Sequence, residues 1–282
     1  MNPKRVLAIH DLSGVGRCSL TVALPILSAC GLEACALPTA VLSTHTGGFS
    51  GYTYRDLTSD IEAMAAHWRS LGLHFDAVYS GYLGSQQQLS ILSALLSSYR
   101  SQNSLILLDP VMADEGKLYT HFDTEFVNGM RSLCSYADII VPNMTEAALL
   151  LDVPYKEPPY SLDYIRSTVY SLHELCHASI VLTGVAFNSK QLGAAVYDAA
   201  SQTFSLCLNQ MIEGVYYGTG DVFASALLGA YLKNADLTAA AQIAVDFTLD
   251  CIIRTKKAGA DPHYGVQFEP ELHSLITKLE RR

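Results

Sequence analysis

Residues 216–232 read YYGTGDVFASALLGAYL, a Gly-Thr-Gly turn that runs directly into an almost wholly apolar, helix-like stretch. The first turn of a helix attracts anions, because its unpaired N–H groups point outward. Gly218, Thr219 and Gly220 are therefore expected to present N–H groups to a phosphate. Asp221 would border this anion hole, where a carboxylate can accept the proton of an acceptor hydroxyl during phosphoryl transfer. The alternative is that Asp221 only stabilises its own helix, by about 0.3–1 kcal/mol.

Along the chain, short apolar runs alternate with segments of helical spacing. Candidate strands are 5–9, 34–41, 76–80, 104–109, 137–142, 179–183, 193–198 and 203–208. Candidate helices are 20–30, 57–70, 87–100, 124–135, 145–151, 163–176, 221–233 and 237–256, followed by a polar tail. This alternation predicts an α/β three-layer sandwich, with helices on both faces of a mostly parallel sheet and an antiparallel hairpin at one edge. We expect a single domain over residues 1–282.

Composition narrows the class of protein. Half of the 282 residues are hydrophobic, only 16% are charged and the net charge is −9, which favours a compact globular protein and argues against a nucleic-acid partner. The seven cysteines are scattered without CxxC spacing, as is typical of reduced thiols. The sequence shows neither a secretory leader nor an apolar run of about 18 residues. We therefore expect a cytoplasmic protein without a membrane partner.

In a parallel sheet, ligands bind beyond the carboxyl ends of the strands, so the residues that follow each strand are the candidates. The first such segment, HDLSGVGRCS (10–19), has Gly14 and Gly16 in the spacing of a dinucleotide fingerprint. Ser19 occupies the third glycine position, and no acidic residue closes the second strand. A dinucleotide site is therefore only a minor alternative.

Oxygen ligands follow two later strands. Asp109 and Asp114 come after one strand, and Asn143 and Glu146 come around the start of the next helix. Together they suit Mg²⁺, which keeps several waters and takes one or two protein carboxylates. The alternative is structural: Asn143 would be an N-cap and Glu146 a helix-start carboxylate.

Two further segments could contact a small ligand. The loop STHTGGFSGYTY (43–54) contains His45, which is either a ligand contact or a solvated side chain. The segment SGYLGS (80–85) contains Tyr82, which either stacks on a flat ring or is structural.

These motifs carry a family resemblance. GTGD at the start of a late apolar helix, together with NMTE after a middle strand, resembles the ribokinase-like superfamily of small-molecule kinases. LSTHTGG (42–48), SGYLGS and DPVMADEGKLY are similar to segments of vitamin B6 (pyridoxal and pyridoxamine) kinases, in the same order. The resemblance covers essentially the whole chain. Neither GxxxxGK[ST] nor the protein-kinase signature set occurs.

The resemblance implies ATP-dependent phosphorylation of the 5′-hydroxymethyl group of pyridoxal, pyridoxine or pyridoxamine, with Asp221 as the base and Mg²⁺ as the metal. It also implies a homodimer, and it leaves open whether the enzyme uses a monovalent cation. The implied ATP-binding residues are Asp109, Asn143, Glu146 and Thr183. The implied metal residues are Asp109, Asp114 and Glu146. The implied pyridine pocket comprises Asp11, Leu42, His45, Thr46 and Tyr82, beside Asp221.

Three other functions compete. Hydroxymethylpyrimidine kinases share the scaffold and the aspartate base, but they tend to show a Gly-Gly-Ala-Gly run where this chain has SGVGRCS. Sugar kinases usually add a β-stranded lid. A non-catalytic B6-binding module would have no need for Asp221.

One position departs from the resemblance. Many pyridoxal kinases have a serine where this chain has Asp11, so this carboxylate either pairs with a cationic vitamer or merely caps its loop.

Overall fold

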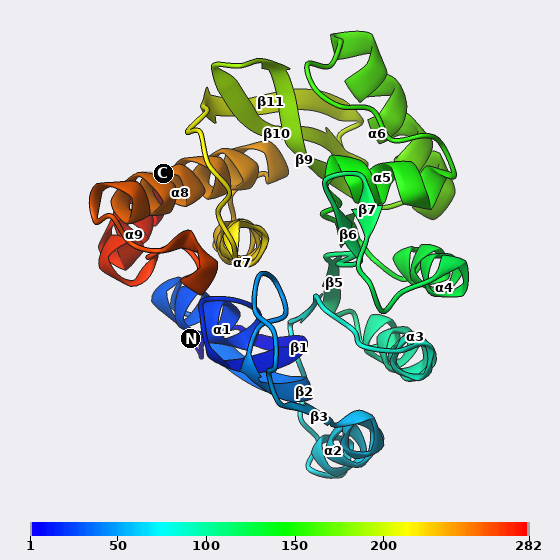
Figure 1. Ribbon diagram of the computed structural model, residues 1–282. Helices are drawn as coiled ribbons and strands as arrows, with labels where there is room; N and C mark the ends of the chain where they lie inside the picture. Colours follow the sequence, from blue (N-terminus) through cyan, green and yellow to red (C-terminus); the bar gives the residue numbers. More distant parts are fainter. Residues whose placement is uncertain (1, 281–282) are drawn as a thin grey trace.

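A nine-stranded sheet forms the centre of the molecule in the computed structural model, which describes residues 2–280. The strands stand in the order β11-β10-β9-β8-β5-β4-β1-β2-β3 (Figure 1). They are β1 (Arg5–Val15), β2 (Glu33–Thr44), β3 (Tyr54–Asp56), β4 (Ala77–Ser80), β5 (Leu105–Leu108), β8 (Ile139–Ile140), β9 (Ser179–Asn188), β10 (Gln191–Asp198) and β11 (Thr203–Gln210). A separate two-stranded ribbon consists of β6 (Ala113–Asp114) and β7 (Lys117–Leu118).

The centre of the sheet is parallel, as predicted. Strands β2, β1, β4, β5, β8 and β9 pair in parallel with one another, in that order. Strand β10 is antiparallel to β9 and β11, which confirms the edge hairpin, and the short β3 is antiparallel to β2 at the other edge. The sequence of β5 is continuously apolar because both faces of a central parallel strand are covered by helices.

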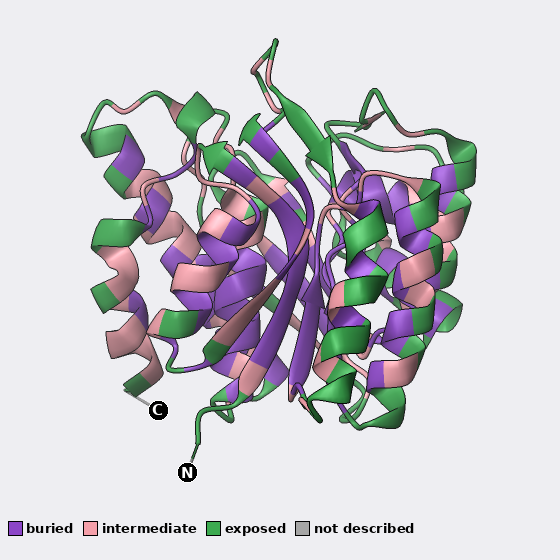
Figure 2. Cartoon of the chain, turned by 90° about the horizontal axis from the view of Figure 1, so that it is seen from below, coloured by how far each residue is buried: buried purple, intermediate pink, exposed green. Residues whose placement is uncertain are grey.

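Helices cover both faces of the sheet (Figures 1 and 2). One face carries α2 (Thr58–Ser70), α3 (Gln86–Ser101), α4 (Thr124–Cys134), α5 (Met144–Leu151) and α6 (Leu162–Cys176). The other carries α1 (Leu20–Ala29), α7 (Thr219–Leu232), α8 (Leu237–Lys257) and α9 (Leu272–Glu280). Two 3-10 helices, Pro262–Tyr264 and Glu269–Glu271, lie between α8 and α9. Each helical layer has its own buried cluster, which confirms the three-layer sandwich.

Two predictions about local structure were wrong. Strand β1 extends to Val15, so residues 10–15 continue the strand and Gly14 does not lie in a dinucleotide-binding turn. The predicted polar tail instead contains α9, whose Leu275 is completely buried. Apolar periodicity failed at residues 10–15 because the side chains buried there, His10, Asp11 and Ser13, are polar. In α9 only Leu275 is fully buried, while Leu272 and Leu279 are partly buried against the core.

Nine of the eleven strands described between residues 2 and 280 belong to one sheet, which is consistent with a single domain; the single domain itself stays a prediction. None of the helices described between residues 2 and 280 is long and apolar enough to cross a membrane.

Candidate active site

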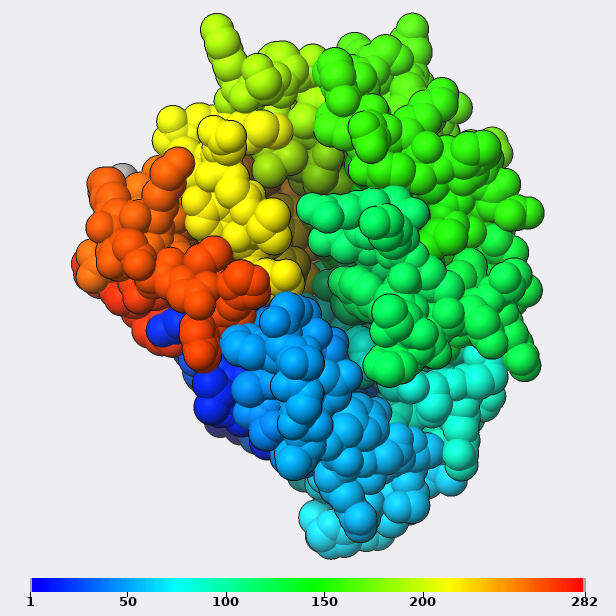
Figure 3. Space-filling view, viewed as in Figure 1, coloured from blue at the N-terminus to red at the C-terminus, as the bar shows by residue number. Residues whose placement is uncertain are grey.

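A hollow opens at the centre of the face shown in Figure 3. It is bounded by yellow residues that precede α7, by light-blue residues that follow β2, and by green residues around β6 and β7. These segments follow strand ends, where parallel sheets bind ligands. Asp109, Glu146 and Asp221 lie close enough to influence one another electrostatically, so the structure gathers these three predicted residues at one edge of the sheet.

The helix α7 begins in a turn that only glycine can make. Gly218 has a φ of +75°, and a Cβ there would lie 2.0 Å from the carbonyl oxygen of Arg17. The hydroxyl of Thr219 donates to the carbonyl oxygen of Tyr216 at 3.2 Å and steadies the turn. Gly220 is exposed, with open space where a Cβ would stand. The first turn of α7 is therefore accessible to an anion.

Asp221 lies mostly buried at this helix start, with its side chain 16% exposed. Its Oδ2 accepts a hydrogen bond from the backbone N–H of Ser19 at 2.8 Å, and its Oδ1 lies 4.0 Å from Nδ1 of His10. Burial raises the pKa of Asp221 to about 7, although the Ser19 hydrogen bond opposes this shift. A carboxylate with such a pKa can accept and release a proton near neutral pH.

Asn143 and Glu146 form a capping box at the start of α5, so the structural interpretation of these residues is confirmed. The Asn143 side chain accepts from the N–H groups of Thr145 and Glu146, and its Nδ2 donates to the carbonyl oxygen of Ala113. Both oxygens of Glu146 accept backbone N–H groups, from Met112 at 3.1 Å and from Asn143 at 2.9 Å. Burial nevertheless raises the pKa of Glu146 to about 8.

Asp109 is buried directly after β5. Burial, and then the nearby carboxylates of Glu146 and Asp221, raise the pKa of Asp109 well above its ordinary value. Asp114 is exposed on β6. Within residues 2–280, no three His, Cys, Asp or Glu side chains converge as a direct metal-binding cluster, so the predicted metal residues are neighbours rather than a closed ligand set.

Thr183 occupies the end of the parallel part of β9. Its N–H and its hydroxyl both donate to the carbonyl oxygen of Pro142, at 2.9 and 3.3 Å. Thr183 therefore lies beside Asn143, the residue that follows Pro142 and caps α5. The structure therefore places Thr183, a predicted nucleotide contact, at the sheet edge that carries Asn143.

The predicted pyridine-pocket residues come from β1, β2 and the segment after β4. Asp11 is buried and accepts hydrogen bonds from the hydroxyls of Ser13 and Ser19, at 2.9 and 2.5 Å. Burial raises the pKa of Asp11, while the hydrogen bonds from Ser19 and Ser13 oppose that shift. Tyr82 is half-buried, and this burial, more than the nearby Tyr54 and Asp11, raises its pKa. Leu42 is buried on β2.

His45 is a buried side chain with a defined hydrogen bond, so it is not simply solvated. Its Nε2 lies 2.7 Å from the carbonyl oxygen of His263. Because a carbonyl oxygen only accepts, Nε2 carries the proton, and Nδ1 of neutral His45 is an acceptor. The ring also contacts Phe49 and Tyr217. The neighbouring Thr46 is exposed.

Residues 261–266, which we call the C-terminal clasp, were not predicted to contribute. The backbone N–H of Arg17 donates to the Tyr264 carbonyl oxygen at 3.0 Å, and the N–H of Val266 donates to the Tyr217 carbonyl oxygen at 3.1 Å. The clasp therefore ties the segment after β1, the His45 loop and the residue before Gly218 together. These contacts join distant parts of the chain and leave no local signal in the sequence.

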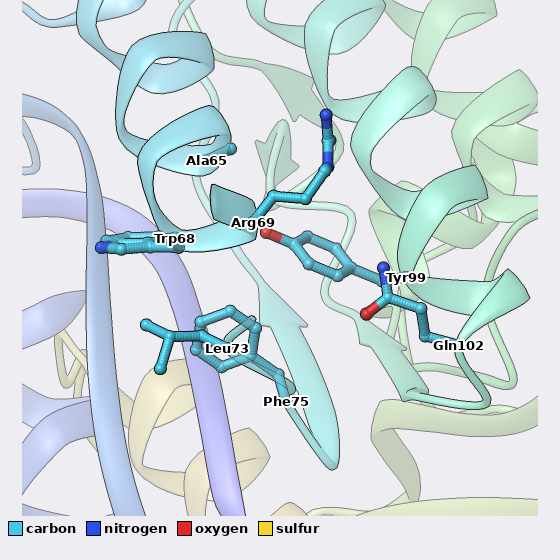
Figure 4. Close-up of a pocket in the computed structure, with 7 residues that line it drawn as sticks. All are labelled: Ala65, Trp68, Arg69, Leu73, Phe75, Tyr99 and Gln102. Carbon is cyan, nitrogen blue, oxygen red and sulfur yellow. The ribbon is translucent and has the colours of Figure 1, made fainter. Parts of the chain in front are cut away.

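Two cavities lie away from Asp221. Figure 4 shows the first, a gap of about 10 Å³ among Trp68, Phe75 and Tyr99, which is barely large enough for one water. The second is an open surface pocket of about 540 Å³. It is lined by Lys4, Leu105, Asp198, Ala200, Tyr231, Leu232, Asn234, Ala235, Asp236 and Leu237. Lys4 and Leu105 precede or begin their strands, so this pocket lies at the edge of the sheet opposite the candidate site.

A sequence profile of the phosphomethylpyrimidine kinase family matches residues 24–266. A Bacteroides thetaiotaomicron protein, provisionally described as a phosphomethylpyrimidine kinase and crystallised with pyridoxal, is 38% identical; the match has a TM-score of 0.92 and covers 97% of this chain and 96% of that one. Pyridoxal kinase from Lactobacillus plantarum is 33% identical, with a TM-score of 0.89 and 99% of both chains covered. Pyridoxal kinase of Arabidopsis thaliana is 30% identical over 278 residues, covering 92% of this chain and 85% of its own.

Proposed function

Because the chain belongs to the phosphomethylpyrimidine kinase family and is a small-molecule kinase with the ribokinase-like fold, we propose that it transfers the γ-phosphoryl group of ATP to the 5′-hydroxymethyl group of a B6 vitamer. The product is the vitamer 5′-phosphate. We also propose that the chain acts as a homodimer.

Asp221 carries this proposal. It combines a pKa of about 7 with a place beside the accessible first turn of α7. In the proposed reaction, the acceptor hydroxyl gives its proton to Asp221 while its oxygen bonds to the γ-phosphorus. The bond from that phosphorus to the β-phosphate oxygen breaks, and ADP leaves. The N–H groups of Gly218, Thr219 and Gly220 hold the transferred group and the charge that develops on it.

The carboxylates of Asp109 and Glu146 suit a nearby Mg²⁺. Both are buried with raised pKa values and interact unfavourably with each other, which is an arrangement that a cation would relieve. When bound, Mg²⁺ supplies charge neutralisation to the phosphates. Because the Glu146 oxygens already accept backbone N–H groups, we propose that it acts through water. Asp114 lies nearby, and Asn143 and Thr183 serve the nucleotide phosphates from the same edge.

The vitamer is proposed to lie among Asp11, Leu42, His45, Thr46 and Tyr82. His45 offers an acceptor at Nδ1, Asp11 offers a carboxylate, and the Tyr82 ring can stack on a pyridine. The Bacteroides protein that is 38% identical was crystallised with pyridoxal, which supports a pyridine as the occupant of this pocket. Asp11 is further proposed to favour the cationic vitamer, pyridoxamine.

Hydroxymethylpyrimidine is the second candidate acceptor, because the matching family is named for phosphomethylpyrimidine kinase. The deciding experiment measures ADP release with Mg·ATP and each of pyridoxal, pyridoxine, pyridoxamine and hydroxymethylpyrimidine. We expect kcat/KM for one B6 vitamer to exceed that for the pyrimidine by at least about 10-fold, or about 1.4 kcal/mol. A preference for the pyrimidine would overturn the substrate assignment and keep the kinase. No turnover with any acceptor would overturn the proposed function.

One substitution tests the alternative that the chain is a non-catalytic B6-binding protein. Asp221→Asn keeps the side-chain shape and removes the base. We expect kcat to fall by about 10²- to 10⁴-fold, while the Kd for pyridoxal and for ATP, measured by calorimetry, stays close to that of the wild type. A variant that loses no turnover would contradict the role of Asp221.

A further inference from the structure

His10, on β1, is a completely buried histidine beside the proposed base. Within the described chain, neither of its ring nitrogens has a hydrogen-bond partner. Leaving a buried donor unpaired costs stability, so such a group in a folded protein calls for an explanation. Among residues 2–280, Asp221 is the only acidic residue within ion-pair distance of His10, with its Oδ1 4.0 Å from Nδ1.

The His10 ring is held in place by neighbouring residues on two sides. The Tyr79 ring meets it edge-on, with a centroid separation of 4.3 Å. On another side lies Gly81, where a Cβ would come within 2.3 Å of His10 Nδ1. Gly81 does not adopt a positive φ, so the space for the histidine, rather than the backbone conformation, requires a glycine there. The ring is therefore held close to Asp221 by its neighbours.

The two oxygens of Asp221 have different surroundings. Its Oδ2 already accepts the N–H of Ser19, whereas its Oδ1 faces His10. Burial lowers the pKa of His10 to about 3, so the imidazole stays neutral and can offer one N–H but no positive charge. Hydrogen bonds in active sites are often long in the ligand-free enzyme and shorten once the substrate is bound.

We propose that His10 is a positioning residue for Asp221: its Nδ1–H donates to Oδ1 of the carboxylate when the site is loaded. Oδ2 is then fixed by Ser19 and Oδ1 by His10, so that the carboxylate is oriented toward the acceptor hydroxyl by two donors from β1 and the segment that follows it. A small closure, from 4.0 Å to hydrogen-bond distance, satisfies the buried donor. This role rests on the proposed function of Asp221 as the base.

Two substitutions of similar shape separate positioning from packing. His10→Asn can place an amide N–H where Nδ1 stands, whereas His10→Leu fills the same space without a donor. We expect His10→Leu to lower kcat at least about 10-fold relative to His10→Asn, with KM for the acceptor changed less than about 2-fold. In the Asp221→Asn background the two variants should have equal kcat, because a residue acting through Asp221 has nothing left to position. Equal kcat for both variants with Asp221 intact, or an undiminished difference without it, would overturn the role.

A measurement that needs no turnover tests the same contact. In ¹H–¹⁵N spectra of the imidazole groups, His10 should carry its proton on Nδ1, and that proton should shift in Asp221→Asn. A proton on Nε2 alone would overturn the proposal. If the wild type phosphorylates no acceptor, the proposed function fails, and the spectrum still decides whether His10 donates to Asp221.

Discussion

Gly218, which precedes α7, and Gly220, in the first turn of α7, are predicted to respond oppositely in stability to substitution by alanine. Gly218→Ala places a Cβ on a residue with a φ of +75° and 2.0 Å from the Arg17 carbonyl oxygen. The left-handed conformation costs a residue other than glycine about 1–2 kcal/mol, and the backbone contact forces the Arg17 segment to move. We expect the free energy of unfolding to fall by about 2–4 kcal/mol.

Gly220→Ala is the matched control. Gly220 lies inside the helix without a positive φ, and the space around its missing Cβ is open. Alanine is a better helix former than glycine, so the free energy of unfolding should rise by up to about 1 kcal/mol. The added methyl group nevertheless stands where a phosphate must approach. We therefore expect kcat/KM for ATP to fall by about 10- to 100-fold in this more stable variant.

Urea unfolding followed by linear extrapolation measures the stability of both variants, and ADP release measures their activity. We thus expect Gly218→Ala to be destabilised and Gly220→Ala to be more stable but less active than the wild type. A Gly220→Ala variant with wild-type kcat/KM would refute the anion-hole assignment. A Gly218→Ala variant as stable as the wild type would refute the structural requirement for glycine.

Three other changes are predicted for the same site. As the pH falls below about 7, Asp221 becomes protonated and can no longer accept a proton. Well below this pKa, kcat/KM should therefore decline about tenfold per pH unit. A flat pH profile between 5 and 8 would contradict the assignment of this base. Asp11→Ser should lower the ratio of kcat/KM for pyridoxamine over pyridoxal, since it removes a carboxylate that can pair with the 4′-amine; an unchanged ratio rules out this role. Chelation by EDTA should abolish ADP release and added Mg²⁺ should restore it, whereas full activity in EDTA would exclude a divalent-metal requirement.

Local motifs in the sequence indicated where two groups of residues in the candidate site would lie. Gly218 and Asp221 sit in one contiguous turn, and Asn143 and Glu146 satisfy each other within one helical turn, so their spacing alone indicates their place. His10 could not be recognised in this way. It stands inside an apolar strand, and its relation to Asp221 depends on how β1 and α7 pack.

Long-range hydrogen bonds were equally invisible in the sequence. Ser19 and Asp221 are 202 residues apart, yet a backbone N–H of one holds the carboxylate of the other. His45 and His263 are 218 residues apart. The parallel centre of the sheet was predictable, because buried parallel strands are continuously apolar. The end of β1 was not, because its buried residues His10, Asp11 and Ser13 are polar, and α9 was missed because only Leu275 is fully buried there.

The C-terminal clasp also affects when the pocket can form during protein synthesis. Residues 261–266 leave the ribosome after every strand of the sheet and after both α7 and α8. Chains begin to fold from their N-terminal side while they are being made. The sheet can thus assemble while His45 still lacks the carbonyl oxygen of His263 and Tyr217 still lacks the N–H of Val266. A nascent chain can therefore assemble its sheet first and its finished pocket only afterwards.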